Sequence, residues 1–221
     1  MKIYLIRHGE TDWNIAGRLQ GREDIPLNER GMRQALDLGR TLSSVKEQIK
    51  ISSIFSSPLS RAYDTASVIA QSLGIEYVEV NDGFTERDFG SLSGKAPTAG
   101  HSIFSPDETA SGLEPLEEVS RRFIAAIEHC STSGLRNTSN TGNILIVSHG
   151  GAINAVLSKV SNGEAGTGKT RLKNCSINIL LRNGPYNFSL DVFNLSPEQF
   201  LAGEKPLTSS QLHSITDYFH S

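Results

Sequence analysis

Two apolar, β-prone runs in this chain each lead into a histidine that is followed by a glycine. Residues 2–6 lead into His8, and residues 143–147 lead into His149. A short apolar run that ends near glycine is typical of a buried strand followed by a turn. In a parallel α/β sheet, ligands bind at the carboxyl ends of the strands. The pattern therefore predicts such a sheet, with both histidines at its ligand-binding edge.

The residues around the first histidine favour phosphate chemistry. Arg7 is a permanent cation whose fork of donors suits phosphate oxygens. His8 can act as a nucleophile, a base or an acid near neutral pH. Gly9 lets the backbone approach a ligand closely. Arg-His-Gly alone recurs by chance, so the interpretation depends on the later segments.

Composition limits the partners that this chain is expected to have. The 221 residues carry a net charge of −3 with both signs interspersed, which excludes the footprint of nucleic-acid or anionic-membrane binding. Cys130 and Cys175 lack CxxC spacing, and we see neither a signal peptide nor a membrane span. We expect a reduced, cytoplasmic protein with one large domain.

The coarse pattern alternates strands and helices. Expected strands span 2–6, 51–55, 75–80, 143–147, 175–181 and 186–193, with Asn183-Gly184 as a hairpin turn between the last two. Expected helices span 29–45 after the capping residue Asn28, about 58–73 before Gly74, 114–130, 152–160 and 209–219. Residues 10–27 read as a loop, and residues 131–143 as a polar linker.

Two further segments carry candidate functional residues. Arg61 falls in the first turn of the helix after residues 51–55, where a helix amino terminus and an arginine together favour anions. Residues 83–90 interleave Glu86 and Asp88 with two aromatic residues. A carboxyl group against apolar surface has a raised pKa, which suits a general acid.

Residues 91–114 form a longer loop than a compact domain normally contains, so we expect a lid or substrate loop. Its cations are few, with only Lys95 and His101. Residues 163–170 match the P-loop pattern of nucleotide triphosphatases, but a helix-like stretch precedes them and a β-prone run follows. A P-loop needs the opposite order, so a flexible glycine-rich loop is the default, from which Lys169 reaches over the pocket.

Taken together, four ordered segments resemble the histidine phosphatase superfamily, which includes cofactor-dependent phosphoglycerate mutases. They are Leu5-Ile6-Arg7-His8-Gly9-Glu10-Thr11, Ser56-Ser57-Pro58-Leu59-Ser60-Arg61-Ala62, Thr85-Glu86-Arg87-Asp88-Phe89-Gly90 and Val147-Ser148-His149-Gly150-Gly151. The resemblance implies a three-layer α/β/α sandwich with a mostly parallel sheet.

The resemblance also implies roles for named residues. His8 would attack phosphorus and carry a phosphohistidine, and Glu86 would be the proton donor. The residues implied to bind phosphate or to line the substrate side are Arg7, Asn14, Gln20, Gly21, Arg61, His149 and Gly150. Two arginines and a protonated His149 would neutralise oxygen charge and would keep His8 neutral. The histidines show no ligand spacing such as HxH or HExxH, so we predict no metal and no cofactor.

Departures from the family pattern favour a phosphatase over a mutase. Leu92 stands where the family often has a tryptophan, and residues 91–114 lack the Arg and Pro run that would hold the carboxylate of phosphoglycerate. The predicted function is a metal-independent phosphomonoester phosphatase. The alternatives are a phosphoglycerate mutase or a non-catalytic protein that binds a phosphorylated ligand.

The expected organisation is one histidine phosphatase domain over 1–221, with a lid-like insertion at about 91–114 and a tail from about 196. The expected partner is a small phosphorylated substrate. Strands at 175–193 would form a sheet edge open to pairing with a second copy, so the sequence also admits a homodimer.

Overall fold

The computed structural model describes residues 1–96, 112–133 and 142–204. Within these ranges six strands form one sheet in the order β3-β2-β4-β1-β5-β6. The strands are β1 Lys2–Arg7, β2 Ile51–Ser56, β3 Val78–Val80, β4 Asn143–Ser148, β5 Ile177–Gly184 and β6 Asn187–Leu195. Strands β3, β2, β4 and β1 pair in parallel, whereas β5 pairs antiparallel with both β1 and β6. The predicted α/β class with a mostly parallel sheet is confirmed.

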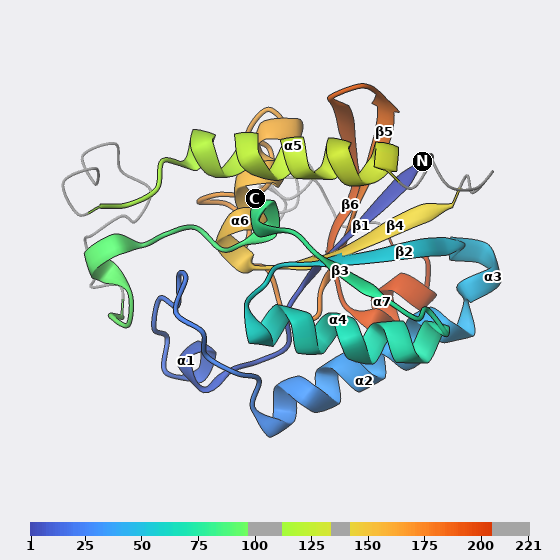
Figure 1. Cartoon of the computed structure of the whole chain (residues 1–221), viewed down its shortest axis with the longest axis horizontal. Coiled ribbons are helices and arrows are strands. Elements are labelled where there is room, and N and C mark those ends of the chain that lie inside the picture. Colours follow the sequence, from blue (N-terminus) through green and yellow to red (C-terminus); the bar gives the residue numbers. More distant parts are fainter. Residues whose placement is uncertain (97–111, 134–141, 205–221) are drawn as a thin grey trace, which may run out of the picture.

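Helices cover both faces of this sheet (Figure 1). Helices α5 and α6 lie above the sheet in that view, and α2, α4 and α7 lie below it. The helices are α1 Asp12–Ile15, α2 Glu29–Ser44, α3 Lys46–Ile49, α4 Ser60–Leu73, α5 Leu116–Ser133, α6 Gly150–Val160 and α7 Pro197–Leu201. Two short 3₁₀ turns, Asp82–Phe84 and Gly90–Leu92, lie in the segment between β3 and α5.

The central strand β1 shows why this sequence forms three layers. Its side chains alternate between two faces, as in any strand. Ile3 and Leu5 join the core under α5 and α6, and Tyr4 and Ile6 join the core under α2 and α4. These four side chains are at most 3% exposed, so both faces of β1 are covered. A continuous apolar run is therefore what this position in the sheet requires.

The predicted helix signals at Asn28 and Gly74 are confirmed. The Asn28 side chain accepts a hydrogen bond from the Gly31 amide at 2.8 Å and caps α2. Gly74 ends α4 in the left-handed region with φ 73°. Helix α4 begins at Ser60, two residues later than expected, because Leu59 is still extended.

Other predicted boundaries were wrong. The hairpin turns at Pro185 and Tyr186, because Gly184 pairs with Asn187 and a proline is favoured at the first central position of a turn. Strand β3 has only three residues. Helix α5 continues to Ser133 and takes up the start of the expected linker.

The segment at 10–27 also differs from the loop that was expected. It contains α1, whose first turn is closed by a capping box between Thr11 and Asn14. The expected features at His101, at most of the lid and at 209–219 lie outside the described residues. Among the helices described, none is long and apolar enough to cross a membrane.

Candidate active site

The sheet register brings the carboxyl ends of β1, β2 and β4 to one edge. Arg7 pairs with Ser148, and Ser56 pairs with Val147. The residues that follow these strands are consequently neighbours in space. They include both histidines, whose ring centroids lie 5.2 Å apart.

His8 is held in one tautomer. Its Nδ1 lies 2.6 Å from the carbonyl oxygen of Gly9, and the side chain is 2% exposed. A carbonyl oxygen only accepts hydrogen bonds, so Nδ1 carries the proton and donates it. The lone pair of the neutral ring is then on Nε2, the nitrogen available to attack an electrophile.

The backbone on both sides of the His8 ring is anchored as well. The Gly9 amide donates to Thr65 Oγ1 at 3.1 Å, and Asn174 Nδ2 donates to the His8 carbonyl at 3.0 Å. Gly9 also lies against the start of α2, where a Cβ on Gly9 would come within 2.5 Å of the Gly31 carbonyl oxygen. Only glycine allows this approach, and it fixes the turn that carries His8.

A buried arginine, Arg61, and a half-buried one, Arg7, flank the histidines. Arg61, at the start of α4, is 0% exposed and donates from Nη1 to the Glu23 carbonyl at 2.6 Å and from Nη2 to the Gly21 carbonyl at 2.8 Å. Arg7 donates from Nη1 to the Leu172 carbonyl. The Nε atoms of both arginines are buried and have no hydrogen-bond partner among the described residues.

Burial lowers the pKa of both arginines. Burial lowers the pKa of Arg61 to about 10, with Glu86 and Asp24 opposing the shift and Arg7 adding to it. Burial also lowers the pKa of Arg7. Arginine remains charged at neutral pH even so, and the site therefore contains two desolvated cations with free donors.

His149 lies behind these cations and is fully buried. Its Nε2 is 2.7 Å from Ser57 Oγ, and its Nδ1 is buried with no hydrogen-bond partner in the described part of the chain. Burial, then Arg61, then His8 and Arg7 lower its pKa well below 6.5. In this structure the shift argues against the protonated His149 expected from the sequence. A phosphate dianion would oppose it, because opposite charge favours the charged form.

The same forces keep His8 neutral. Burial lowers its pKa well below 6.5, and the positive charges of Arg7 and Arg61 lower it further. The hydrogen bond to Gly9 acts in the opposite direction but is the smallest contribution. At pH 7 the ring is therefore uncharged and has its Nε2 lone pair free.

Glu86 is fixed at the amino terminus of α6. Its Oε1 accepts hydrogen bonds from the amides of Arg87 at 2.8 Å and Ala152 at 2.7 Å, and its Oε2 accepts from Gly151 at 3.0 Å. A helix amino terminus has unpaired N–H groups and a positive end of its dipole, so it holds a carboxylate well. A Cβ on Gly151 would come within 2.7 Å of Oε1, which explains the glycine there.

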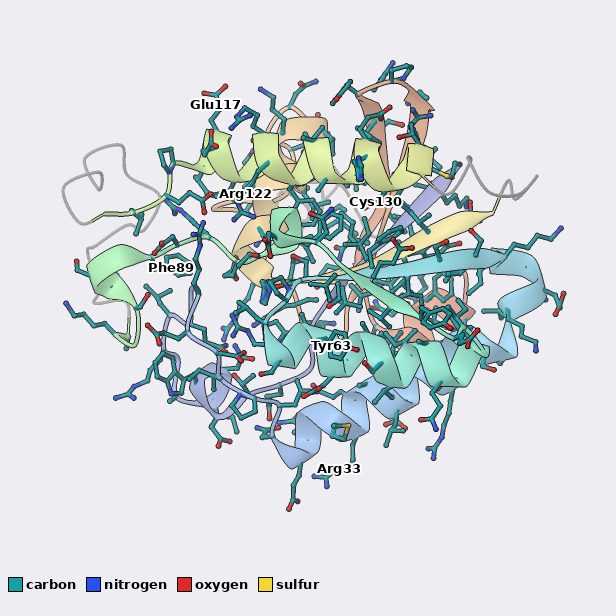
Figure 2. The ribbon with its side chains drawn as sticks, in the orientation of Figure 1. Arg33, Tyr63, Phe89, Glu117, Arg122 and Cys130 are labelled. Atoms are coloured by element: carbon teal, nitrogen blue, oxygen red, sulfur yellow. The ribbon has the colours of Figure 1, made fainter. Side chains whose placement is uncertain are left out.

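Arg122 of α5 holds the loop that carries this acid. Its Nη1 donates to the backbone carbonyls of Gly83 at 2.9 Å and Thr85 at 2.8 Å, and its Nη2 donates to the backbone carbonyl of Glu86 at 3.1 Å. Glu114 accepts from Nε of the same guanidinium at 2.7 Å. Figure 2 shows Arg122 on the side of α5 that faces the sheet, whereas Glu117 points away from it.

A cavity of about 520 Å³ opens over this constellation. Among its lining residues, the polar ones and the glycines beside the histidine and acid segments are Arg7, His8, Asn14, Gln20, Arg61, Glu86, Gly150, Gly151 and Asn154. The apolar lining residues include Trp13, Leu19, Phe89 and Leu116. The loop between α6 and β5 contributes Thr167, Gly168, Lys169, Thr170, Arg171 and Leu172.

The structure brings nearly all the sequence-predicted residues to this cavity. Asn14 and Gln20 line it, and Asn14 Oδ1 accepts from Asn174 Nδ2 at 3.1 Å. Gly21 does not line it; its carbonyl instead holds Arg61. His149 stands behind the lining residues.

Sequence reasoning missed the residues that orient others. Ser57 was visible only as part of a motif, and its bond to His149 depends on β2 lying beside β4. Asn174 and Arg122 stand 166 and 36 positions from the residues they hold, His8 and Glu86, so local pattern gave no signal for either.

Comparison with known proteins identifies the family of this chain. A family model described as the histidine phosphatase superfamily (branch 1) matches residues 3–195. PhoE of Bacillus subtilis (strain 168), described as an uncharacterized phosphatase, is 38% identical over 178 residues, which cover 80% of this chain and 86% of that protein. A metal-independent phosphoserine phosphatase of Arabidopsis thaliana is 33% identical over 215 residues, covering 90% of this chain and 85% of that protein.

A solved structure has the same fold. Phosphoglycerate mutase from Bacillus anthracis str. Sterne superimposes with a TM-score of 0.74, covering 91% of this chain and 95% of the other at 23% identity. At that identity the likeness establishes the fold and not the activity. With the family match and the two phosphatase relatives, it shows that this chain belongs to the histidine phosphatase superfamily.

Proposed function

We propose that this protein is a metal-independent phosphomonoester phosphatase that works through a phosphohistidine on His8. The observation that carries the proposal is the state of His8: a buried, neutral imidazole whose Nδ1 proton is held by Gly9. This leaves Nε2 as a nucleophile beside the cations of Arg7 and Arg61. Such an arrangement is costly to maintain in a protein that only binds ligands, because the buried Nε atoms of both guanidinium groups have no hydrogen-bond partner among the described residues.

In the first step, Nε2 of His8 attacks phosphorus and the ester P–O bond breaks. The free Nε donors of Arg7 and Arg61 would bind the equatorial oxygens, with Asn14 and His149 beside them. Phosphoryl transfer needs chiefly positioning and neutralisation of oxygen charge, which these groups supply. A dianion in this place would also favour protonation of His149 and so recruit a further positive charge.

Glu86 would transfer the proton in both steps. It lines the cavity together with His8 and is fixed by three backbone N–H groups. In its protonated form it gives a proton to the departing alkoxide. Its carboxylate then takes a proton from the water that attacks phosphorus. The P–N bond breaks in this step, which releases phosphate and returns the electron pair to Nε2 of His8.

The relatives support a phosphatase without a metal. The Arabidopsis thaliana protein is described as metal-independent, and the Bacillus subtilis protein as a phosphatase. In this chain the positive charge at the cavity comes from side chains. Over the described residues no group of three or more His, Cys, Asp or Glu is placed to hold a metal ion.

The proposal is tested by phosphate release from a panel of phosphomonoesters in EDTA, with wild type beside His8→Ala. The panel includes p-nitrophenyl phosphate, phosphoserine and 3-phosphoglycerate. We expect release by wild type and a loss of at least about 1,000-fold in the variant, because the nucleophile is removed. Rapid quenching with labelled substrate should trap a base-stable phosphoenzyme in wild type only.

Three results would contradict the proposal. Near-normal release by His8→Ala would exclude the phosphohistidine, and loss of activity in EDTA would show that a metal takes part. Isomerisation of 3-phosphoglycerate with little free phosphate, dependent on a bisphosphate primer, would identify a mutase instead.

A further inference from the structure

The loop between α6 and β5 is a built part of the cavity wall. The side chain of Asn154 donates to the Thr170 carbonyl at 2.9 Å, and the Gly166 amide donates to Thr170 Oγ1 at 2.9 Å. A Cβ on Gly166 would come within 2.3 Å of the Asn154 carbonyl oxygen, so the loop is packed tightly on α6. This is the segment that matches the P-loop pattern, yet a helix precedes it and a strand follows it.

The loop presents two cations to the cavity. Lys169 and Arg171 line the cavity and are exposed to solvent. Neither side chain has an ion pair or hydrogen bond within the described ranges, 1–96, 112–133 and 142–204. Arg171 is near enough to the phosphate-binding side to lower the pKa of Arg7. Positive charge therefore continues from the phosphate site along this wall.

Two buried polar atoms accompany these cations. Thr167 Oγ1 and Asn154 Oδ1 have no hydrogen-bond partner in the portion of the chain described, and both residues line the cavity. Buried polar groups are nearly always paired, so unpaired ones on a cavity wall indicate where a ligand would bind. A hydroxyl group can donate to an anion's oxygen, and an amide oxygen can accept from a hydroxyl or ammonium group.

Neighbouring charges do not cancel this field. Arg18 also lines the cavity, with its guanidinium 5.5 Å from the centre of the Trp13 ring. The acidic side chain in the cavity lining is Glu86, and its carboxylate is already hydrogen-bonded to backbone amides at the start of α6. The cavity lining thus combines cationic side chains with the apolar side chains of Trp13, Leu19, Phe89, Leu116 and Leu172.

We propose that Lys169 and Arg171 form a subsite for a second anionic group, a carboxylate or phosphate, on the leaving group of the substrate. The inference rests on the proposed phosphatase function and narrows its substrate class to phosphomonoesters with such a group. It also changes the expectation drawn from residues 91–114, because the cations for a carboxylate come from a different loop.

The test compares substrates that differ only in the second anion. 3-Phosphoglycerate is matched with glycerol 1-phosphate, in which a hydroxymethyl group replaces the carboxylate. Fructose 1,6-bisphosphate is matched with fructose 6-phosphate for the phosphate case. We expect wild type to show at least about a tenfold higher kcat/KM for the anionic member of one pair, and this ratio to fall with added salt. The pair that shows it identifies the anion.

Variants assign the preference to the loop. Lys169→Gln and Arg171→Gln should each reduce this kcat/KM ratio about fivefold, mainly through KM. The reason is that each substitution removes one exposed positive charge of the protein that would attract the anionic substrate. Lys169→Arg should retain it. Lys173→Gln is the matched control, since Lys173 is exposed in the same segment but does not line the cavity. Equal kcat/KM for both members of each pair, or a ratio unchanged in the double variant, would overturn the inference.

A binding measurement distinguishes failure of this inference from failure of the proposed function. Titration calorimetry with the His8→Ala variant measures binding of each substrate without turnover. If wild type released no phosphate, the proposed function would fail. Tighter binding of the anionic member, lost in the double variant at Lys169 and Arg171, would still support the subsite, and equal affinities would refute it.

Discussion

At the scale of single residues, the site depends on burying two imidazoles beside two guanidinium groups. His8 and His149 are at most 2% exposed, and their rings stand next to each other. Arg7 and Arg61 repel a proton on either ring. The arrangement keeps the nucleophile ready, and it ties the stability of the fold to the protonation of these rings.

Stability should therefore fall in mild acid. The folded pKa of both histidines lies below the unfolded value of about 6.5, so below that pH the unfolded chain binds more protons than the native one. Each ring should remove about 1 kcal/mol of unfolding free energy between pH 6.5 and pH 5.5, and nothing above about pH 7.5. Urea unfolding at several pH values measures this. His8→Asn and His149→Asn should each flatten the profile, and profiles parallel to wild type would contradict the pKa shifts.

At the scale of elements, helix α5 holds the loop that carries Glu86, although α5 is not part of the sheet edge where the histidines lie. Arg122 donates to the backbone carbonyls of Gly83, Thr85 and Glu86 itself. Its guanidinium is in turn oriented by Glu114. Burial raises the pKa of Glu114, but the hydrogen bonds from Arg122 and the Asp88 amide, together with the charges of Arg122 and Arg22, lower it overall. The Arg122–Glu114 pair joins α5 to the loop that carries Glu86. A second contact comes from β4, where Ser148 Oγ donates a hydrogen bond to the Phe84 carbonyl at 2.7 Å.

Arg122→Gln should loosen this loop and misplace Glu86. We expect kcat to fall about 10-fold to 100-fold for alkyl phosphates, whose leaving groups need a proton, and much less for p-nitrophenyl phosphate, whose leaving group does not. Arg121→Gln is the matched control, because Arg121 is the adjacent arginine on α5 and pairs with Glu118 at the surface. An equal loss for both substrate types would mean that Arg122 supports the whole fold and not the acid.

The elements that could be predicted from the sequence are those that a local residue pattern encodes. Strands β1 and β4 were found because residues buried on both faces give unbroken apolar runs. The turn at Pro185 and Tyr186 was missed because the Asn-Gly signal two residues earlier is stronger in general, yet here Gly184 is still paired. Lys169 was placed near the cavity, but Arg122, Ser57 and Asn174 act through contacts that only the assembled sheet creates.

At the scale of the whole molecule, one sheet separates two cores. Leu5 belongs to the core with α5 and α6, and Ile6 belongs to the core with α2 and α4, and both side chains are fully buried. They are adjacent in β1, which pairs with β4 and β5 on its two sides. Loss of packing in either core is therefore transmitted to the same central strand.

Leu5→Ala and Ile6→Ala should each lower the unfolding free energy by about 3 kcal/mol, since each leaves a cavity in a dense core. Both should shift a single denaturation midpoint with little change in slope, because one strand joins the two cores. Circular dichroism and tryptophan fluorescence, followed together in urea, measure this. Two separated transitions in either variant would show that the layers unfold independently.

The hydrogen bond between His8 Nδ1 and the Gly9 carbonyl has a consequence for the chemistry of any covalent intermediate. A phosphoryl group accepted by this ring can attach only at Nε2, so the product would be the tele positional isomer of the phosphoramidate. The proton would stay on Nδ1 and remain hydrogen-bonded to the Gly9 carbonyl oxygen throughout, which keeps the modified ring from rotating. The geometry of one backbone carbonyl thereby decides the regiochemistry of the modification.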